Sequence, residues 1–121
     1  MPARKIMVVD DSATERWYIA DLLVRSGYEV VTADSGADAL AKVRLERPSL
    51  IVMDVVMPGR NGFHLTRTIS RDPRWTDVPI IICSSKDQET DKVWALRQGA
   101  RDYVVKPVEA QVLLSKIRGL G

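Results

Sequence analysis

Cysteine and histidine are almost absent from the sequence, which has one of each in 121 residues. The single cysteine, Cys83, excludes an internal disulfide and a cysteine metal cluster, and its place in the apolar run 80–83 predicts a small core residue. Apolar runs of membrane-spanning length and a signal-peptide-like N-terminus are also lacking, so we expect a cytoplasmic protein. The net charge is only +2, with Lys and Arg spread along the chain, which gives no case for nucleic-acid binding.

Five short apolar segments alternate with five helical patterns along the chain. The apolar segments cover residues 5–9, 28–33, 50–53, 80–83 and 103–105 and are nearly continuous in Val, Ile, Leu and Met. Such runs indicate parallel strands that are covered on both faces. Strands that alternate with helices predict an α/β fold, a three-layer open sheet with right-handed crossovers. We find no linker or repeat and expect one domain over residues 1–121, without an output domain.

The helical patterns carry start signals and inward-facing residues. The first opens with "SATE", which predicts a capping box between Ser12 and Glu15. The second is capped by Ser35, and we expect it to turn Leu40 and Ala41 toward the core. The other three patterns cover about 61–71, 88–98 and 110 to the C-terminus.

Polar side chains follow four of the five predicted strands. They are Asp10 and Asp11 after the first strand, Asp54 after the third, Ser84 and Ser85 after the fourth, and Lys106 after the fifth. Each alone has a plainer explanation, since Asp and Ser often cap turns and a lone Lys is usually a solvated charge. The carboxyl ends of parallel strands share one edge of a sheet, where ligands bind in open α/β folds. Because all these groups fall at that edge, we expect a functional site there.

Three carboxylates in one place repel one another, and a divalent cation would relieve that repulsion. The cluster offers oxygen ligands and no cysteine, and the one histidine, His64, lies in the third helical pattern, so Mg²⁺ is the expected ion. The first loop is acidic rather than glycine-rich, which argues against a phosphate-binding nucleotide loop. A carboxylate beside Mg²⁺, a lysine and a hydroxyl suits phosphoryl transfer: Asp54 would attack phosphorus, while Lys106 and Ser84 contact the transferring oxygens.

Four stretches in this order carry a family resemblance: "VVDDS" (8–12), "IVMDVVMPGRNG" (51–62), "PIIICSS" (79–85) and "GARDYVVKP" (99–107). Over essentially its whole length the chain resembles the CheY-like response-regulator receiver domains. The resemblance implies a flavodoxin-like (βα)5 doubly wound parallel sheet with strand order 2-1-3-4-5. It also implies a cis bond between Lys106 and Pro107.

The resemblance assigns roles residue by residue. These are Asp54 as phosphoacceptor; Asp10, Asp11, Asp54 and the Val56 backbone carbonyl as Mg²⁺ ligands; Ser84 and Tyr103 as switch residues; and Lys106 as the lysine that contacts the phosphoryl group. Tyr103 could instead be a plain core aromatic. Val56 and Lys86 stand at positions that vary in the family, which leaves the lifetime of the aspartyl phosphate open.

Residues 84–107, "SSKDQETDKVWALRQGARDYVVKP", look closer still to single-domain regulators of type IV pilus twitching motility. That resemblance implies a signalling domain rather than an enzyme, with a CheA-like or other histidine kinase as phosphodonor. A downstream motility or regulatory protein would read the surface of the fourth helix, fifth strand and fifth helix. We expect a monomer or weak dimer without nucleic-acid or membrane partners. Trp94, in this region, could pack in the helix layer or contact a partner.

Other functions are compatible with parts of the same pattern. A phosphate sink that drains a shared kinase, or a receiver-like adaptor that binds partners without phosphorylation, would carry much the same residues. An aspartyl-phosphate hydrolase of the haloacid-dehalogenase type needs a second Asp two residues after the nucleophile, where this chain has Val56, and a cap insertion that it lacks. A flavodoxin-like mononucleotide binder is disfavoured by the acidic first loop.

Overall fold

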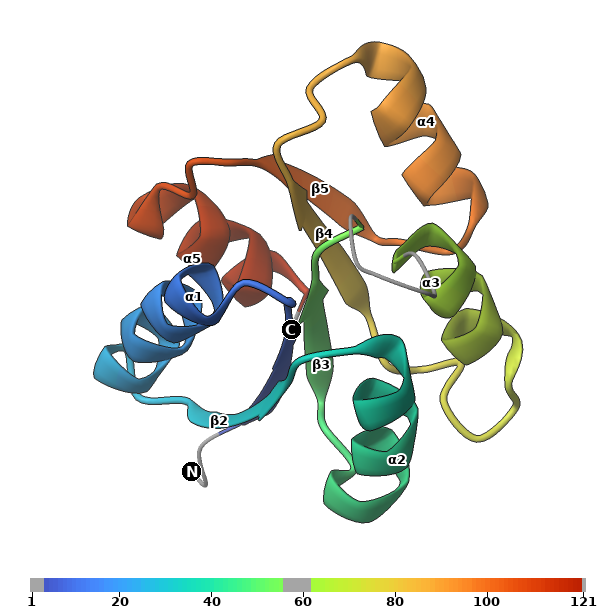
Figure 1. The fold of residues 1–121 in the computed structure, drawn as a ribbon, viewed down its shortest axis with the longest axis horizontal. Helices are drawn as coiled ribbons and strands as arrows, with labels where there is room; N and C mark the ends of the chain where they lie inside the picture. The colour runs from blue at the N-terminus through green and yellow to red at the C-terminus, as the bar shows by residue number, and fades with distance from the viewer. Residues whose placement is uncertain (1–3, 56–61, 121) are drawn as a thin grey trace.

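The computed structural model describes residues 4–55 and 62–120, in which five parallel strands form one sheet in the order β2-β1-β3-β4-β5 (Figure 1). The strands are β1 (Lys5–Val9), β2 (Glu29–Ala33), β3 (Leu50–Met53), β4 (Ile80–Ser84) and β5 (Asp102–Val105). The helices are α1 (Ala13–Arg25), α2 (Gly36–Glu46), α3 (Gly62–Arg71), α4 (Glu89–Arg97) and α5 (Ala110–Gly119). The predicted fold class and strand order are confirmed.

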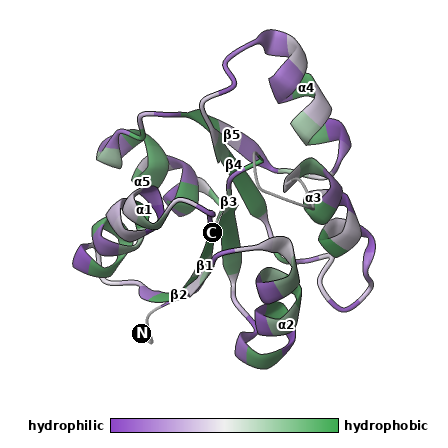
Figure 2. Ribbon diagram, in the orientation of Figure 1, coloured by the Kyte–Doolittle hydropathy of each residue, from purple (hydrophilic) through white to green (hydrophobic). Residues whose placement is uncertain are grey.

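The sheet lies between two helix layers, with α1 and α5 on one face and α2, α3 and α4 on the other (Figure 1). Successive side chains of a strand point to opposite faces, so each strand contributes to both layers. Val8 of β1 belongs to a buried cluster with Ile19 of α1, whereas the neighbouring Met7 belongs to a second cluster with Leu65 of α3. Each such side chain contributes about 1.5–3 kcal/mol when fully buried. Figure 2 shows apolar strands between helices that carry both polar and apolar residues.

The central strands are buried along their whole length, which is why their sequences are continuously apolar. The edge strand β2 differs: Glu29 is exposed and only Ala33 is fully buried. Cys83 of β4 is a core residue as predicted, and burial raises the pKa of its thiol to about 12, which leaves it unreactive. No helix in the described ranges has the length and apolar character needed to cross a bilayer.

The inward face of α2 differs in one residue from the prediction. Ala39 and Val43 are buried and Leu40 packs partly against the core, but Ala41 is exposed. Residues four apart share a helix face, so Ala39 and Val43 define the buried stripe and Ala41, two positions from each, lies outside it. The prediction for Ala41 was therefore wrong, because a single alanine does not distinguish the two faces.

Candidate functional site

Backbone hydrogen bonds fix three of the predicted site residues at the carboxyl edge of the sheet. The Asp54 N–H donates to the Val9 carbonyl at 2.9 Å, and the Lys106 N–H donates to the Ser84 carbonyl at 2.8 Å. The Asp10 N–H donates to the last carbonyl of β2 at 3.1 Å. These bonds extend the strand ladder by one residue in each case, so the three side chains leave the sheet at the same edge.

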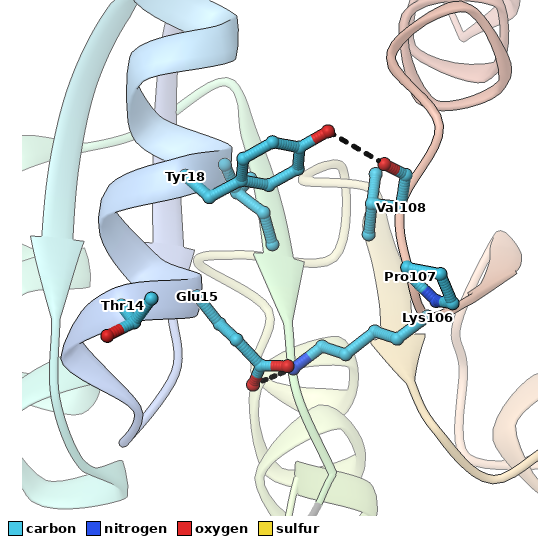
Figure 3. Close-up of a pocket in the computed structure, with 7 residues that line it drawn as sticks. Thr14, Glu15, Tyr18, Lys106, Pro107 and Val108 are labelled. Atoms are coloured by element: carbon cyan, nitrogen blue, oxygen red, sulfur yellow. Dashed lines mark hydrogen bonds and ion pairs between the residues drawn. The ribbon is translucent and has the colours of Figure 1, made fainter.

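Lys106 lies at the centre of this edge, in contact with three carboxylates. Its Nζ is 2.8 Å from Asp10 Oδ2, 2.8 Å from Glu15 Oε2 and 3.6 Å from Asp54 Oδ2 (Figure 3 shows the Glu15 contact). Burial lowers the pKa of Lys106, but its hydrogen bonds to Asp10 and Glu15 and the nearby charge of Asp54 outweigh burial and raise the pKa above its usual value. Lys106 is therefore an ammonium ion over the whole physiological pH range.

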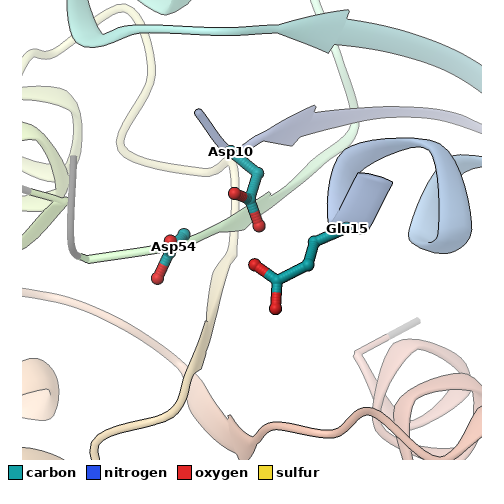
Figure 4. Close-up of side chains that lie close together, drawn as sticks. All are labelled: Asp10, Glu15 and Asp54. Carbon is teal, nitrogen blue, oxygen red and sulfur yellow. The ribbon is translucent and has the colours of Figure 1, made fainter. Parts of the chain in front are cut away.

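The carboxylates of Asp10, Glu15 and Asp54 form an acidic group with oxygens within 4.8 Å of one another (Figure 4). Asp10 and Asp54 are buried, at 1% and 7% exposure, so their charges are poorly screened by water. The acidic residues outnumber the single ammonium between them, and the site retains excess negative charge. A set of carboxylate oxygens with excess negative charge suits a hard cation such as Mg²⁺.

Two of the residues expected to bind metal are not part of this group. The Asp11 side chain is exposed and is absent from the set of close carboxylates, and Val56 lies outside the described residues. Their metal-binding roles stay predictions. His64 is exposed on α3 and is likewise outside the group.

Glu15 is the member of the acidic group that the sequence did not reveal, because it was assigned to a capping box. The first half of that box is present, since the Ser12 hydroxyl accepts from the Glu15 N–H at 3.4 Å. The second half is wrong: the Ser12 N–H donates to Asp10 Oδ1 at 2.9 Å, and the Glu15 carboxylate extends to Lys106 instead. Because Asp10 already accepts from the Ser12 N–H, the Glu15 carboxylate is not needed for capping and is available to the site.

Ser84 and Tyr103 both form hydrogen bonds with the backbone of the same residue, Lys86. Ser84 is fully buried at the end of β4, and its Oγ accepts from the Lys86 N–H at 3.2 Å. Tyr103 of β5 is 8% exposed, and its hydroxyl donates to the Lys86 carbonyl at 2.8 Å. Burial raises the pKa of Tyr103, so the phenol stays protonated as this donor. A displacement of Ser84 would thus alter the segment that holds Tyr103.

A groove of about 290 Å³ adjoins Lys106 on the α1 side of the site (Figure 3). It lies between the first turns of α1 and the segment that connects β5 to α5. Tyr18 of α1 crosses it, and the Tyr18 hydroxyl donates to the Val108 carbonyl at 3.0 Å. The Lys106–Pro107 bond in this wall is cis, as the resemblance implies.

Gly62→Ala is expected to lower the free energy of unfolding by about 2–3 kcal/mol, because it overpacks the junction of α3 with the site. A Cβ at Gly62 would lie 2.6 Å from Val55 Cα and closer still to the Asp54 carbonyl oxygen, and these backbone atoms cannot rotate away. Urea unfolding measures the loss. The matched control is Gly119→Ala in α5, where a Cβ meets nothing within 4 Å and stability should be unchanged or slightly higher. Equal stability of Gly62→Ala and wild type would contradict this description of the junction.

Comparisons with known proteins agree with this geometry. Residues 6–118 match the response regulator receiver domain family. Protein PilH of Pseudomonas aeruginosa is 47% identical over 116 residues, which cover 96% of each chain. The transcriptional regulatory protein AfsQ1 of Streptomyces coelicolor is 40% identical over 115 residues, which are 95% of this chain but 50% of AfsQ1.

Solved structures show the same fold. The chemotaxis protein CheY4 of Vibrio cholerae superposes with a TM-score of 0.92 at 30% identity, covering 98% of this chain and 99% of CheY4. A response regulator structure from Chloroflexus aurantiacus gives a TM-score of 0.93 at 29% identity, covering 98% of this chain and 97% of that one. With its sheet order, its acidic edge around Lys106 and these matches, the chain belongs to the response regulator receiver domain family, a family of two-component signalling domains rather than of enzymes that turn over a separate substrate.

Proposed function

We propose that this chain accepts a phosphoryl group on Asp54 from a histidine kinase and transmits that event through a change of surface. The observation that carries the proposal is the arrangement of Asp54, Asp10 and Lys106, two carboxylates and one ammonium held at one sheet edge. Asp54 is 7% exposed, so it is shielded from bulk water but still reachable from outside. We propose that Asp10, Asp11, Asp54 and the Val56 carbonyl hold Mg²⁺.

The proposed transfer is a displacement at phosphorus. An Asp54 carboxylate oxygen forms a bond to the phosphorus of a phosphohistidine while the P–N bond breaks, and the electron pair of that bond stays on the imidazole nitrogen. Mg²⁺, when bound, neutralises charge on the phosphoryl oxygens. Lys106 Nζ, 3.6 Å from Asp54 Oδ2, would donate to one of these oxygens, and the Ser84 hydroxyl to another.

The proposed signal passes from Ser84 to α4 and β5. When the Ser84 hydroxyl turns toward a phosphoryl group on Asp54, its hydrogen bond from Lys86 changes, and Lys86 also anchors Tyr103. Two arrangements of this segment would give a two-state equilibrium that phosphorylation biases. The output surface would be formed by α4, β5 and α5. Trp94 of α4 is half exposed, which supports partner contact over helix packing.

The proposed setting is a cytoplasmic chemosensory phosphorelay that controls pilus-based twitching motility. Residues 84–107 resemble twitching-motility regulators, and the match with PilH over 96% of both chains adds support. A CheA-like kinase would be the donor, and a motility or regulatory protein the receiver of the signal. A phosphate sink would use the same chemistry and would differ only in having no downstream protein that responds to the phosphorylated form.

Intact-mass spectrometry after incubation with acetyl phosphate tests the proposal. We expect addition of one phosphoryl group in the presence of Mg²⁺ and little in the presence of a chelator. Tryptophan fluorescence, recorded in parallel, should change and then recover after the donor is removed, which gives the lifetime. Comparison of Trp17→Phe, Trp75→Phe and Trp94→Phe shows whether the reporting residue is on α1, beside the core before β4 or on α4. A chain that binds its partners but gains no mass would instead be an unphosphorylated adaptor.

A further inference from the structure

The ammonium group of Lys106 is held by two hydrogen bonds, to Asp10 and Glu15, and lies 3.6 Å from Asp54 Oδ2, an ion pair beyond hydrogen-bond distance. An ammonium ion has three N–H donors, and three carboxylates surround this one. A phosphoryl oxygen on Asp54 would need one of those donors. The two existing hydrogen bonds fix the position of Nζ, so a movement of Nζ toward a phosphoryl oxygen on Asp54 would lengthen at least one of them.

The two closest partners of Lys106 differ in how firmly they are held. Asp10 is 1% exposed, and its second oxygen accepts from the Ser12 N–H at 2.9 Å, so two contacts fix it. The Glu15 side chain is 48% exposed and reaches the site from the first turn of α1. Water can replace the Lys106 contact of Glu15 at low cost, whereas it cannot reach Asp10. Glu15 is therefore the partner that can leave.

We propose that Glu15 is a positioning residue that holds the Lys106 ammonium in its unphosphorylated position and loosens its contact when Asp54 is phosphorylated. This inference rests on the proposed function, because it assumes that Asp54 carries the phosphoryl group. Glu15 and the phosphoryl oxygen would compete for the position of the Lys106 ammonium. Glu15 would thereby stabilise the unphosphorylated form and lower the affinity of the site for a phosphoryl group.

Tyr18 limits the change to the Lys106 side chain, because it holds the backbone that follows Lys106 in place. Tyr18 lies three residues after Glu15 on α1, and residues three apart share a helix face. Its hydroxyl bonds the carbonyl of Val108, two residues after Lys106. The segment that carries Lys106 is thus held to α1 at two points, one through a side chain and one through its backbone. When the contact between Glu15 and Lys106 is lost, the hydrogen bond from Tyr18 to the Val108 carbonyl remains.

Titration with beryllium fluoride, a phosphoryl mimic, tests the competition at equilibrium. At saturating Mg²⁺, we expect Glu15→Gln to bind the mimic about two- to fivefold more tightly than wild type, the range expected from loss of a half-exposed ion pair. The difference should shrink as ionic strength rises, because salt screens an exposed pair. Glu29→Gln, which removes an exposed acid at the opposite end of the sheet, controls for overall charge and should bind like wild type.

Combination with Lys106→Met separates this role from a direct one. If Glu15 acts through Lys106, then Glu15→Gln should have no effect on affinity in the Lys106→Met background. A persisting effect, or weaker Mg²⁺ binding by Glu15→Gln alone, would make Glu15 a metal ligand and overturn the inference. The Mg²⁺ affinity of Glu15→Gln alone gives the same test should the double variant not fold.

The same titration distinguishes failure of the inference from failure of the proposed function. Equal affinity of wild type and Glu15→Gln, each lost in Asp54→Asn, would overturn the role of Glu15 and leave the phosphoacceptor role intact. If neither wild type nor Glu15→Gln shows binding of the mimic that is lost in Asp54→Asn, the proposed function is overturned and the inference with it.

Discussion

Asp54→Asn is expected to abolish labelling by acetyl phosphate completely while the chain stays folded. The amide of asparagine is neutral and lacks the nucleophilic carboxylate oxygen that the proposed transfer requires. Its size matches that of aspartate, so the buried position at the end of β3 keeps its packing. Intact-mass spectrometry, with peptide mapping of wild type, measures both the extent and the position of the label. Labelling of Asp54→Asn at another residue would contradict the assignment.

The same variant should be more stable than wild type. Asp54 is one of three close carboxylates with one ammonium among them, so its removal relieves repulsion from Asp10 and Glu15. At an effective dielectric constant of about 20, a gain of about 1 kcal/mol in the free energy of unfolding is expected. Asp77→Asn is the matched control: Asp77 is exposed in the connection before β4, and labelling and stability should not change. A loss of stability in Asp54→Asn would show that repulsion does not dominate at this edge.

The sequence is sufficient to predict the edge of the sheet at which these charges meet. Apolar runs such as β3 and β4 end abruptly, and the residue that follows a parallel strand is placed by the strand itself. For Asp54 and Lys106 the ladder continues through their own N–H groups, so the positions of these residues depend on backbone geometry rather than on side-chain packing. That dependence explains why the sequence predicts the position of Asp10, Asp54 and Lys106 at this edge, while their roles stay predictions.

Contacts made by long side chains across the sheet edge were not predictable in the same way. Glu15 and Lys106 are 91 positions apart, and nothing local to either residue indicates the other. The local pattern of Ser12 and Glu15 instead predicted a capping box. The hydrogen bond from the Ser12 N–H to the Glu15 carboxylate that such a box needs is replaced by one to Asp10. The hydrogen bond from Tyr18 to Val108 spans 90 positions and is likewise a product of the fold.

The site combines features that oppose stability with one that supports it. Three carboxylates at one edge favour binding of a cation and of a phosphoryl group, but they repel each other in the folded state. Lys106 is the residue of the described site that offsets this repulsion, through contacts with all three. Loss of the Asp54 carboxylate and loss of the lysine should therefore change stability in opposite directions.

Lys106→Met is accordingly expected to lower the free energy of unfolding by about 3 kcal/mol in a chelator-containing buffer, as loss of one partner from a buried ion pair does. The Lys106 side chain is 9% exposed, and that of Asp10 only 1%, so water cannot replace the lost ammonium. Methionine keeps most of the length and apolar volume of the lysine stem, which limits the loss to the charge. Urea unfolding measures the change.

Lys116→Met provides the matched control for that loss. Lys116 pairs with Asp102 at 2.9 Å, but the two side chains are 31% and 38% exposed, so its removal should cost less than about 1 kcal/mol. Saturating Mg²⁺ should restore more stability to Lys106→Met than to wild type, because the variant leaves more uncompensated negative charge for a cation to bind. Equal losses in the two lysine variants would mean that Lys106 behaves as an ordinary surface charge. Its contacts with Asp10 and Glu15 would then contribute nothing beyond those of an exposed pair, and the competition proposed for Glu15 would have no energetic basis.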